Sequence, residues 1–363
     1  MKTEKIEEFY SQFTARKVLF LLFLLVAVAV SLLAATVVGA ARISVGDSLR
    51  VVAARLFPFL ASGARLGLAE TVVMDLRLPR ALLAVIAGMS LAGSGAAMQA
   101  ILRNPLADPY ILGISAGASF GAAFTIVIGS SLLGGSPGFS GLLGPYVIVG
   151  SAFVFGLITM FLIYGVARLK GGGPETLILA GVAIGYLFSA GVSALKYVSG
   201  HEQLREIVLW LMGGLAGARW QTIYLLLPLV LGALGLLVRY AWDLNALSAG
   251  EEVASNLGVN VRILRRNCAI LASLLASGIV AFTGIIGFIG LVSPHICRIL
   301  IGNDHRFLIP CSGLMGALLL LGADTLARTI ISPTELPVGI ITSLVGAPFF
   351  LYLLFKRRRQ CWT

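Results

Sequence analysis

The sequence predicts an all-α polytopic membrane protein with about ten transmembrane helices. Hydrophobic residues make up 58% of the 363 residues, and charged residues make up only 12%. Many apolar runs approach about 20 residues, the length that an α-helix needs to cross a bilayer. A water-soluble domain of this size could not bury so much apolar surface, so the bilayer must act as its solvent. We therefore expect function in the short polar segments between the apolar runs.

Ten apolar segments predict the transmembrane helices, with boundaries good to about three residues. They span residues 18–41, 80–102, 114–133, 145–169, 176–198, 221–240, 268–283, 288–301, 308–329 and 338–355. The seventh and eighth segments are short, which fits either tilted helices or a half-helix buried within the protein. The first segment has a basic flank like a signal peptide. Its apolar run exceeds the roughly 7–15 residues typical of one, so we expect a retained helix.

The net charge of +11 could suggest a nucleic-acid partner until the placement of the basic residues is considered. We take residues 1–17 as a cytoplasmic tail. Ten spans then put most of the 27 Lys and Arg residues on the cytoplasmic side, as the positive-inside rule requires. The basic balance is therefore explained by topology and predicts that both termini are cytoplasmic. Membrane lipid is the expected partner, and nucleic acid is not.

The whole chain, residues 1–363, is expected to form one membrane domain with two surface helices. Residues 42–77 form the longest external segment, and their spacing of Arg, Leu, Val and Phe predicts an amphipathic helix. This helix could lie on the membrane surface or pack against the protein. A second surface helix is predicted at residues 202–215, where the apolar residues are too few to span a bilayer.

Basic residues on the outer side run against the charge bias of the chain. Arg77 and Arg80 are three residues apart and share one helix face, while Asp324 and Arg328 have the i, i+4 spacing of an ion pair. The two arginines could simply anchor the helix at the membrane surface or could meet a partner that bears carboxylates. The Asp324 pair could likewise be structural, functional or both.

Three further polar segments interrupt the apolar pattern. Residues 103–113, RNPLADPYILG, contain two prolines and an Asn, which predict a rigid turn suited to a gate or a docking point. Residues 244–261 contain a short helical pattern at 251–257 between Gly250 and Gly258, which fits either a helix that docks into another protein or a solvated connector. Residues 284–306 predict a broken helix that either borders a pathway or serves packing.

The sequence carries no recognisable catalytic machinery. It has no phosphate-binding loop for ATP, no Ser-His-Asp set and no paired carboxylates. The four cysteines lack C-x-x-C spacing, and the three histidines are scattered, so neither a metal nor a cofactor is expected on this chain. We expect a transport protein that is not an enzyme. The alternative is a secondary transporter driven by an ion gradient, for which Asp324 is the best candidate ion site.

Several strings together resemble the FecCD family of ABC importer permeases, which carry vitamin B12 and iron chelates. They are RLPR (77–80), GSGAAMQAILRNPLADPYILG (93–113), WLMGGL (210–215), LGVNV (257–261), GFIGLVSPH (287–295), NDHRFLIP (303–310) and ADTLARTIISPTELPVGIITSLVGAPFFLYLL (323–354). The resemblance runs from about residue 75 to 356, with order and spacing kept.

The resemblance implies a homodimeric permease with ten spans per subunit in a bacterial inner membrane or an archaeal plasma membrane. Two ATPase subunits, which bind ATP and Mg, would dock on the cytoplasmic side, and a periplasmic or lipid-anchored binding protein would dock outside. The implied cargo is a metal chelate, most often a ferric siderophore and otherwise cobalamin or haem. Permeases with this signature also include carriers of oxyanions.

The resemblance also implies roles for particular residues. The binding protein would meet Arg77, Arg80 and Arg328. The ATPase would meet a coupling helix that includes Glu251, Glu252, Ala254, Leu257 and Gly258. The cytoplasmic gate would include Asn104 and Leu106, and the pathway at the dimer axis would be lined by Gly181, Tyr186 and Ser189. One departure is GGGPET (171–176), where family members often have hydroxyl residues at the inner gate. Glu175 and Thr176 are expected there instead, and a glutamate would disfavour anionic cargo.

Overall fold

A computed structural model describes residues 2–39, 43–56, 67–132, 144–169, 173–332 and 334–356. Seven helices in these ranges are long and apolar enough to cross a membrane, and shorter apolar helices cover 114–129, 289–301 and 338–352. All ten apolar segments predicted from the sequence are helical, which confirms the fold class.

The helices of the ten predicted spans are α1 (Lys2–Val37), α4 (Leu78–Ile101), α5 (Ile114–Leu132), α6 (Gly144–Leu169), α7 (Pro174–Val198), α9 (Trp220–Arg239), α12 (Val261–Thr283), α13 (Ile289–Ile301), α14 (His305–Thr329) and α15 (Val338–Lys356). The shorter helices are α2 (Val45–Leu56), α3 (Gly67–Thr71), the π-helix η2 (Val72–Arg77), the 3-10 helix η3 (Pro109–Leu112), α8 (His201–Leu211), α10 (Ala241–Ser248) and α11 (Glu251–Asn256).

The described part of the 1–17 tail is helical and continues α1, which begins at Lys2. One predicted boundary is wrong. The seventh span begins at Val261 and is not short, because Asn260 caps the helix there by accepting a hydrogen bond from the Ile263 amide at 3.1 Å. The arginines that follow lowered the hydropathy of this segment without ending the helix.

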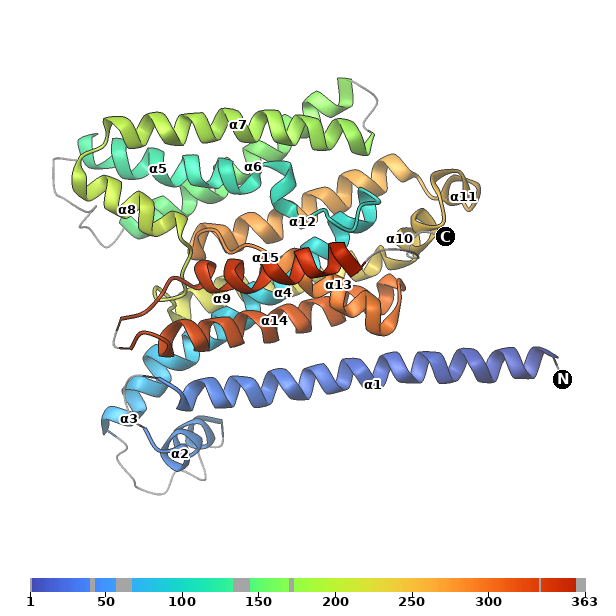
Figure 1. The fold of residues 1–363 in the computed structure, drawn as a ribbon, viewed down its shortest axis with the longest axis horizontal. Coiled ribbons are helices and arrows are strands. Elements are labelled where there is room, and N and C mark those ends of the chain that lie inside the picture. Colours follow the sequence, from blue (N-terminus) through green and yellow to red (C-terminus); the bar gives the residue numbers. More distant parts are fainter. Residues whose placement is uncertain are drawn as a thin grey trace.

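Helix α4 forms the centre of the bundle, with 83% of its most apolar window buried. It contacts α9, α12, α13 and α14 (Figure 1). Glycines allow these close approaches. A Cβ atom at Gly88 would collide with the Gly316 carbonyl of α14, and one at Gly95 would collide with the Gly290 carbonyl of α13. Small residues at such contacts let the backbones of membrane helices meet directly.

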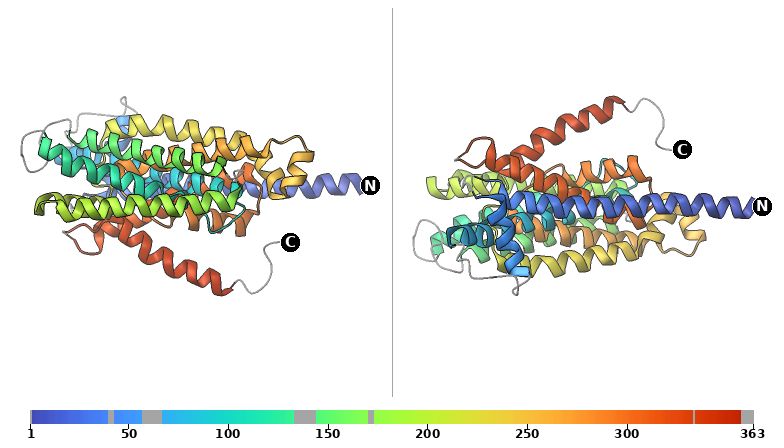
Figure 2. Two further views of the ribbon diagram at one scale, coloured as in Figure 1. Left: turned by 90° about the horizontal axis from the view of Figure 1, so that it is seen from above. Right: turned by 90° about the horizontal axis from the view of Figure 1, so that it is seen from below.

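A second group of helices, α5, α6 and α7, packs beside this core and joins it mainly through α12 (Figure 1). The periphery is much less buried than α4, since the apolar windows of α1 and α7 are only 17% and 22% buried. Helix α1 runs along α14 at the edge of the molecule, and α15 leans away from the bundle (Figure 2). These outer helices leave large apolar side chains exposed, as expected for surfaces that face lipid or another subunit.

The first residues of α1 and the last residues of α15 lie at the same end of the bundle as α10 and α11 (Figure 1). We call this the α11 end. Helices α2, α3 and α8 lie at the opposite end, called the α8 end. Both described chain ends at one side agree with an even number of spans.

The two predicted surface helices are present. Helix α2 lies within the 42–77 segment and packs on α1 and η2, burying Ser48 and Val51 while Val45 and Leu49 stay exposed. It therefore packs on the protein and still presents apolar side chains outward; residues 57–66 lie outside the described residues. Helix α8 ends at Leu211, earlier than predicted, because Gly213 adopts a φ of 67° as the chain turns.

The helix break predicted at 284–306 is present and closely packed. Helix α12 ends where Gly284 adopts a φ of 66°, and α13 begins after Phe288 at a φ of 68°. A Cβ atom at Gly284 would collide with the Trp210 carbonyl, so the break fits tightly against the end of α8. Gly290 then lies against α4, as described above.

A glycine substitution tests the close contact of α4 and α14. We expect Gly88→Ala to destabilise the protein by about 1–3 kcal/mol, because the added methyl overpacks the interface. Gly165→Ala in α6 is the matched control, since a Cβ atom there meets no atom within 4 Å. Thermal unfolding in detergent measures both, and an equal midpoint for the two variants would contradict this packing.

Candidate functional site

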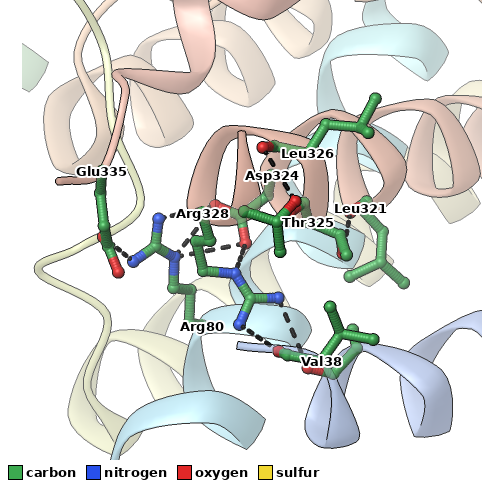
Figure 3. A network of polar contacts seen from close by, with 10 residues as sticks. Val38, Arg80, Leu321, Asp324, Thr325, Leu326, Arg328 and Glu335 are labelled. Carbon is green, nitrogen blue, oxygen red and sulfur yellow. Dashed lines mark hydrogen bonds and ion pairs between the residues drawn. The ribbon is translucent and has the colours of Figure 1, made fainter. Parts of the chain in front are cut away.

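A buried carboxylate at the α8 end, Asp324 of α14, collects two arginines (Figure 3). Arg80 of α4 brings Nη2 to 2.9 Å from Oδ1 and Nε to 3.0 Å from the same oxygen. Arg328, one turn along α14, holds its Nε 3.1 Å from Oδ2. Glu335 pairs with the outer Nη1 of Arg80 and is 46% exposed. The predicted i, i+4 pair is therefore part of a network that joins α4, α14 and the following loop.

At the same end of the molecule, two arginines hold the last turn of α1 by hydrogen bonds to its carbonyl groups. Arg77 donates from Nη1 to the carbonyls of Thr36 at 2.9 Å and Val37 at 2.7 Å. Arg328 donates to the carbonyl of Ala35 at 3.4 Å. The last carbonyls of a helix lack partners within the helix and carry partial negative charge. These guanidinium groups therefore stabilise the end of α1 and tie it to α4 and α14.

Of the three arginines predicted to meet an external partner, two are buried in this structure. Arg77 is 5% exposed and Arg328 is 6% exposed, because both side chains turn inward to the α1 carbonyls and, for Arg328, to Asp324. A charged side chain within the membrane is costly unless it is paired, which explains why both arginine side chains point inward. Arg80 is also largely covered, with its side chain 11% exposed, and within this network Glu335 is the well-exposed charged side chain at 46%.

At the α11 end, the predicted short helix of residues 244–261 is α11, preceded by the unpredicted α10. Gly250 and Gly258 bound it with φ values of 132° and 84°. Ala254 is buried and anchors α11, whereas Glu252, Val253 and Leu257 are exposed. Helix α11 therefore presents one free face that carries acidic and apolar side chains.

Arg265 of α12 connects α11 to the end of α4. It donates to both carboxylate oxygens of Glu251 and, through Nε, to the carbonyl of Ile101 at 3.2 Å. The hydrogen bond from Arg265 holds the pKa of the Glu251 carboxyl below its usual range, so this carboxyl is ionised at neutral pH. Ile101 is the last residue of α4 and leads directly into the predicted gate loop at 103–113.

The loop at 103–113, which is the predicted gate loop, is held by its own polar side chains. The Asn104 side chain accepts a hydrogen bond from the Leu106 amide at 3.0 Å, and Asp108 caps η3 by accepting from the amides of Tyr110 and Ile111. Leu106 is exposed at the turn. The proline-rich segment is thus a specified turn rather than a free connector.

The end of this loop packs on α7. Gly113 has a φ of 65°, and a Cβ atom there would come within 3.0 Å of the Gly181 carbonyl. On the outer face of α7, Tyr186 is 75% exposed and Ser189 is also exposed. Glu175 is exposed and Thr176 half-buried in the first turn of α7, while Gly171 and Gly172 lie outside the described residues. The loop and α7 thus form one continuous contact.

A second carboxylate cluster, which the sequence analysis did not identify, joins three elements at the α11 end. Asp304 accepts hydrogen bonds from Lys17 of α1 at 3.3 Å, Asn245 of α10 at 2.9 Å and the Arg306 guanidinium at 2.7 Å. Burial alone would raise the pKa of Asp304, but the hydrogen bonds from Arg306 and Asn245 hold it well below its usual range. Arg306 also stacks on Trp242, 4.1 Å from the ring centroid. The string NDHR at 303–306 was the available signal.

Among the described residues, no group of three or more His, Cys, Asp or Glu side chains could hold a metal ion. The candidate functional sites are the networks around Asp324 and Asp304, the exposed face of α11 and the loop that packs on α7. None of them presents a nucleophile beside a base.

The sequence profile of the FecCD transport family matches residues 23–356. A protein of Methanocaldococcus jannaschii described as an ABC transporter permease is 46% identical over 98% of this chain and 99% of its own length. The hemin transport system permease of Yersinia pestis is 45% identical over 79% of this chain and 84% of its own. The cobalamin import permease of Halobacterium salinarum is 44% identical over 80% of this chain and 74% of its own.

A solved structure, described as an inward-facing conformation of an ABC transporter of the metal-chelate type, has a TM-score of 0.78 to this chain. The two chains are 34% identical, and the alignment covers 93% of this chain and 98% of the other. The agreement extends over the whole helical bundle.

Removing the buried carboxylate tests the network at the α8 end. We expect Asp324→Asn to lower the free energy of unfolding by about 3–5 kcal/mol, because the buried guanidinium of Arg328 loses its counter-ion and Arg80 keeps only the exposed Glu335. Glu335→Gln is the control and should cost about 0–1 kcal/mol, since that carboxylate is largely exposed. The two unfolding midpoints, measured in the same detergent, should differ clearly; matching midpoints would refute the role of Asp324.

Proposed function

Because this chain belongs to the FecCD transport family, we propose that it is the membrane-spanning permease subunit of an ABC importer for metal chelates. Its relatives include permeases for hemin, cobalamin and Fe(3+)-citrate. We favour a ferric siderophore as cargo, with cobalamin and haem next. The exposed Glu175 at the start of α7 favours cargo without excess negative charge.

The observation that carries the proposal is the unbroken series of contacts between α11 and α7. Helix α11 exposes one face and is bonded through Glu251 to Arg265, which is bonded to the end of α4. The gate loop follows directly and packs against α7 through Gly113 and Gly181. A subunit that moves α11 would therefore act on the loop and on α7 together.

In this proposal α11 is the coupling helix, and the α11 end with both termini lies in the cytoplasm of a plasma membrane. Two ATPase subunits bind ATP and Mg and dock on the exposed side chains of α11. ATP hydrolysis takes place in those subunits and not in this chain. Binding and hydrolysis change which side of the membrane the pathway faces, with Asn104, Leu106, Glu175 and Thr176 at the inner gate.

A second copy of the chain would complete the pathway along α7. Helices α7 and α15 lie on the same side of the bundle (Figure 2), and both are poorly covered. The exposed face of α7 mixes Leu187 with Tyr186, Ser189 and Ser193. Hydroxyl groups at this depth suit a polar pathway better than a surface facing only lipid.

At the opposite end, a binding protein would dock outside around Arg80 and Glu335. Complementary charge would orient it, as at other polar interfaces. Arg77 and Arg328 would act indirectly, by holding α1 and by fixing Asp324 beneath Arg80.

An ion-gradient transporter is less well supported. Such a carrier needs a carboxylate free to bind an ion or a proton within the membrane. Asp324, the best candidate by sequence, is engaged on both oxygens by Arg80 and Arg328.

The coupling role of α11 is tested by copurification. We expect Val253→Ser combined with Leu257→Ser to reduce the ATPase that copurifies with the tagged chain by about tenfold or more, because exposed apolar anchors dominate such interfaces. Leu68→Ser, on exposed α3 at the other end, is the control and should leave the ATPase unchanged. Full retention by the double variant would argue against a coupling helix.

The dimer axis is tested by cross-linking. In a chain with its native cysteines replaced by alanine, Ser189→Cys should cross-link to a second copy, since α7 faces its symmetry mate. Val30→Cys on the exposed face of α1 is the control and should remain monomeric on a denaturing gel. Cross-linking at Val30→Cys with none at Ser189→Cys would place the axis elsewhere.

A further inference from the structure

A cavity of about 360 Å³ opens at the α11 end between α6, α7 and α12. Four arginines line it, together with apolar and aromatic side chains: Arg168, Arg262, Arg265 and Arg266, with Tyr164, Leu177, Ile263 and Ala269. No described residue lining this cavity is acidic. Glu251 already balances the charge of Arg265, and the other three like charges repel one another unless an anion occupies the cavity.

The arginines differ in how far they are already satisfied. Arg265 is committed to Glu251 and to the Ile101 carbonyl. Arg266 donates only to Asn267 at 3.2 Å, and no described carboxylate forms an ion pair with Arg168, Arg262 or Arg266. The first turn of α12 also lies at the cavity, and its partial positive charge adds to the field. Three guanidinium groups are therefore available to an incoming anion.

The position of the cavity selects a membrane ligand. Arg168 lies in the last turn of α6 and Arg262 in the first turn of α12, so both are at the level where these spans end. Tyr164 and Ala269 lie deeper along the same spans and form the apolar part of the wall. One turn deeper still, Phe161 continues the face of α6 that carries Tyr164 and Arg168, and it is 62% exposed.

We propose that this cavity binds the phosphate group of an anionic phospholipid, with Arg168, Arg262 and Arg266 as its ligands. Arginine forks bind phosphate oxygens in pairs. The acyl chains then run along the wall formed by Tyr164 and Phe161 toward the bilayer. A free phosphate ion would use the same arginines but would gain nothing from that wall. Basic pockets between spanning helices are known to hold anionic headgroups.

The occupied site would also touch the transport machinery. Arg265 forms part of the cavity wall and holds both Glu251 of α11 and the end of α4. The phosphate of the bound lipid would therefore place its negative charge beside Arg265, the residue that connects α11 to the end of α4 and the gate loop. The lipid site itself requires only that the chain spans a membrane, and it depends on neither the cargo nor the ATPase.

Native mass spectrometry of the full-length protein, released from detergent after addition of phosphatidylglycerol or phosphatidylcholine, tests the site. We expect wild type to retain phosphatidylglycerol over phosphatidylcholine. The triple variant Arg168→Gln, Arg262→Gln, Arg266→Gln should bind phosphatidylglycerol on the order of 100-fold more weakly. Arg239→Gln is the matched control, because Arg239 is an exposed arginine in the last turn of α9, at the same end, outside the cavity.

The outcomes separate the possible ligands. Unchanged phosphatidylglycerol retention by a folded triple variant, with a wild-type unfolding midpoint, overturns the proposal. The triple Arg→Lys variant keeps the charge and should retain most of the lipid, which guards against a folding artefact. Displacement of the lipid by millimolar inorganic phosphate would overturn the membrane source in favour of a soluble ion. Loss of the ATPase with lipid retention intact would instead assign the arginines to a protein partner and also overturn the proposal.

Discussion

The fold depends on one constraint, that a charge buried among the spanning helices has to be paired. Helix α14 meets it with a carboxylate at each end, Asp304 and Asp324. Asp304 forms an ion pair with Lys17 of α1. Asp324 forms an ion pair with Arg328, which donates a hydrogen bond to a carbonyl in the last turn of α1. Helix α1 has little buried surface of its own, so these polar contacts at Lys17 and at its last turn hold it in place. Removing one partner of a buried ion pair costs more free energy than the intact pair contributes to stability. These pairs therefore act mainly by fixing the position of α1.

Two parts of the molecule differ clearly in how closely their helices are packed. Helix α4 is surrounded by helices that meet it backbone to backbone through Gly88 and Gly95, which leaves little room for displacement. Helix α7 has few buried side chains and contacts α5, α6 and η3 of the loop at 103–113. Arg265 connects α4 to α11, because it donates one hydrogen bond to the end of α4 and others to Glu251 of α11. A movement of α11 would therefore reach the end of α4 through Arg265.

The spans could be predicted from sequence because the bilayer dictates both their length and their composition. The glycines on either side of α11 and the i, i+4 spacing of Asp324 and Arg328 were equally local signals. The inward direction of Arg77 was not predictable, since it depends on where the distant end of α1 comes to lie. The pair of Lys17 and Asp304 is 287 residues apart in sequence, and no periodicity reports such a contact. The start of α12 was mispredicted because its arginines lower hydropathy while caps and partners sustain the helix.

We infer that this chain supplies the pathway and that a partner subunit supplies the energy. The most direct measurement is uptake of a labelled metal chelate into proteoliposomes that contain this chain, its copurifying ATPase and the binding protein. The account predicts accumulation only with ATP and Mg on the ATPase side, and none with the permease alone under a proton or sodium gradient. Gradient-driven accumulation by the permease alone would contradict it.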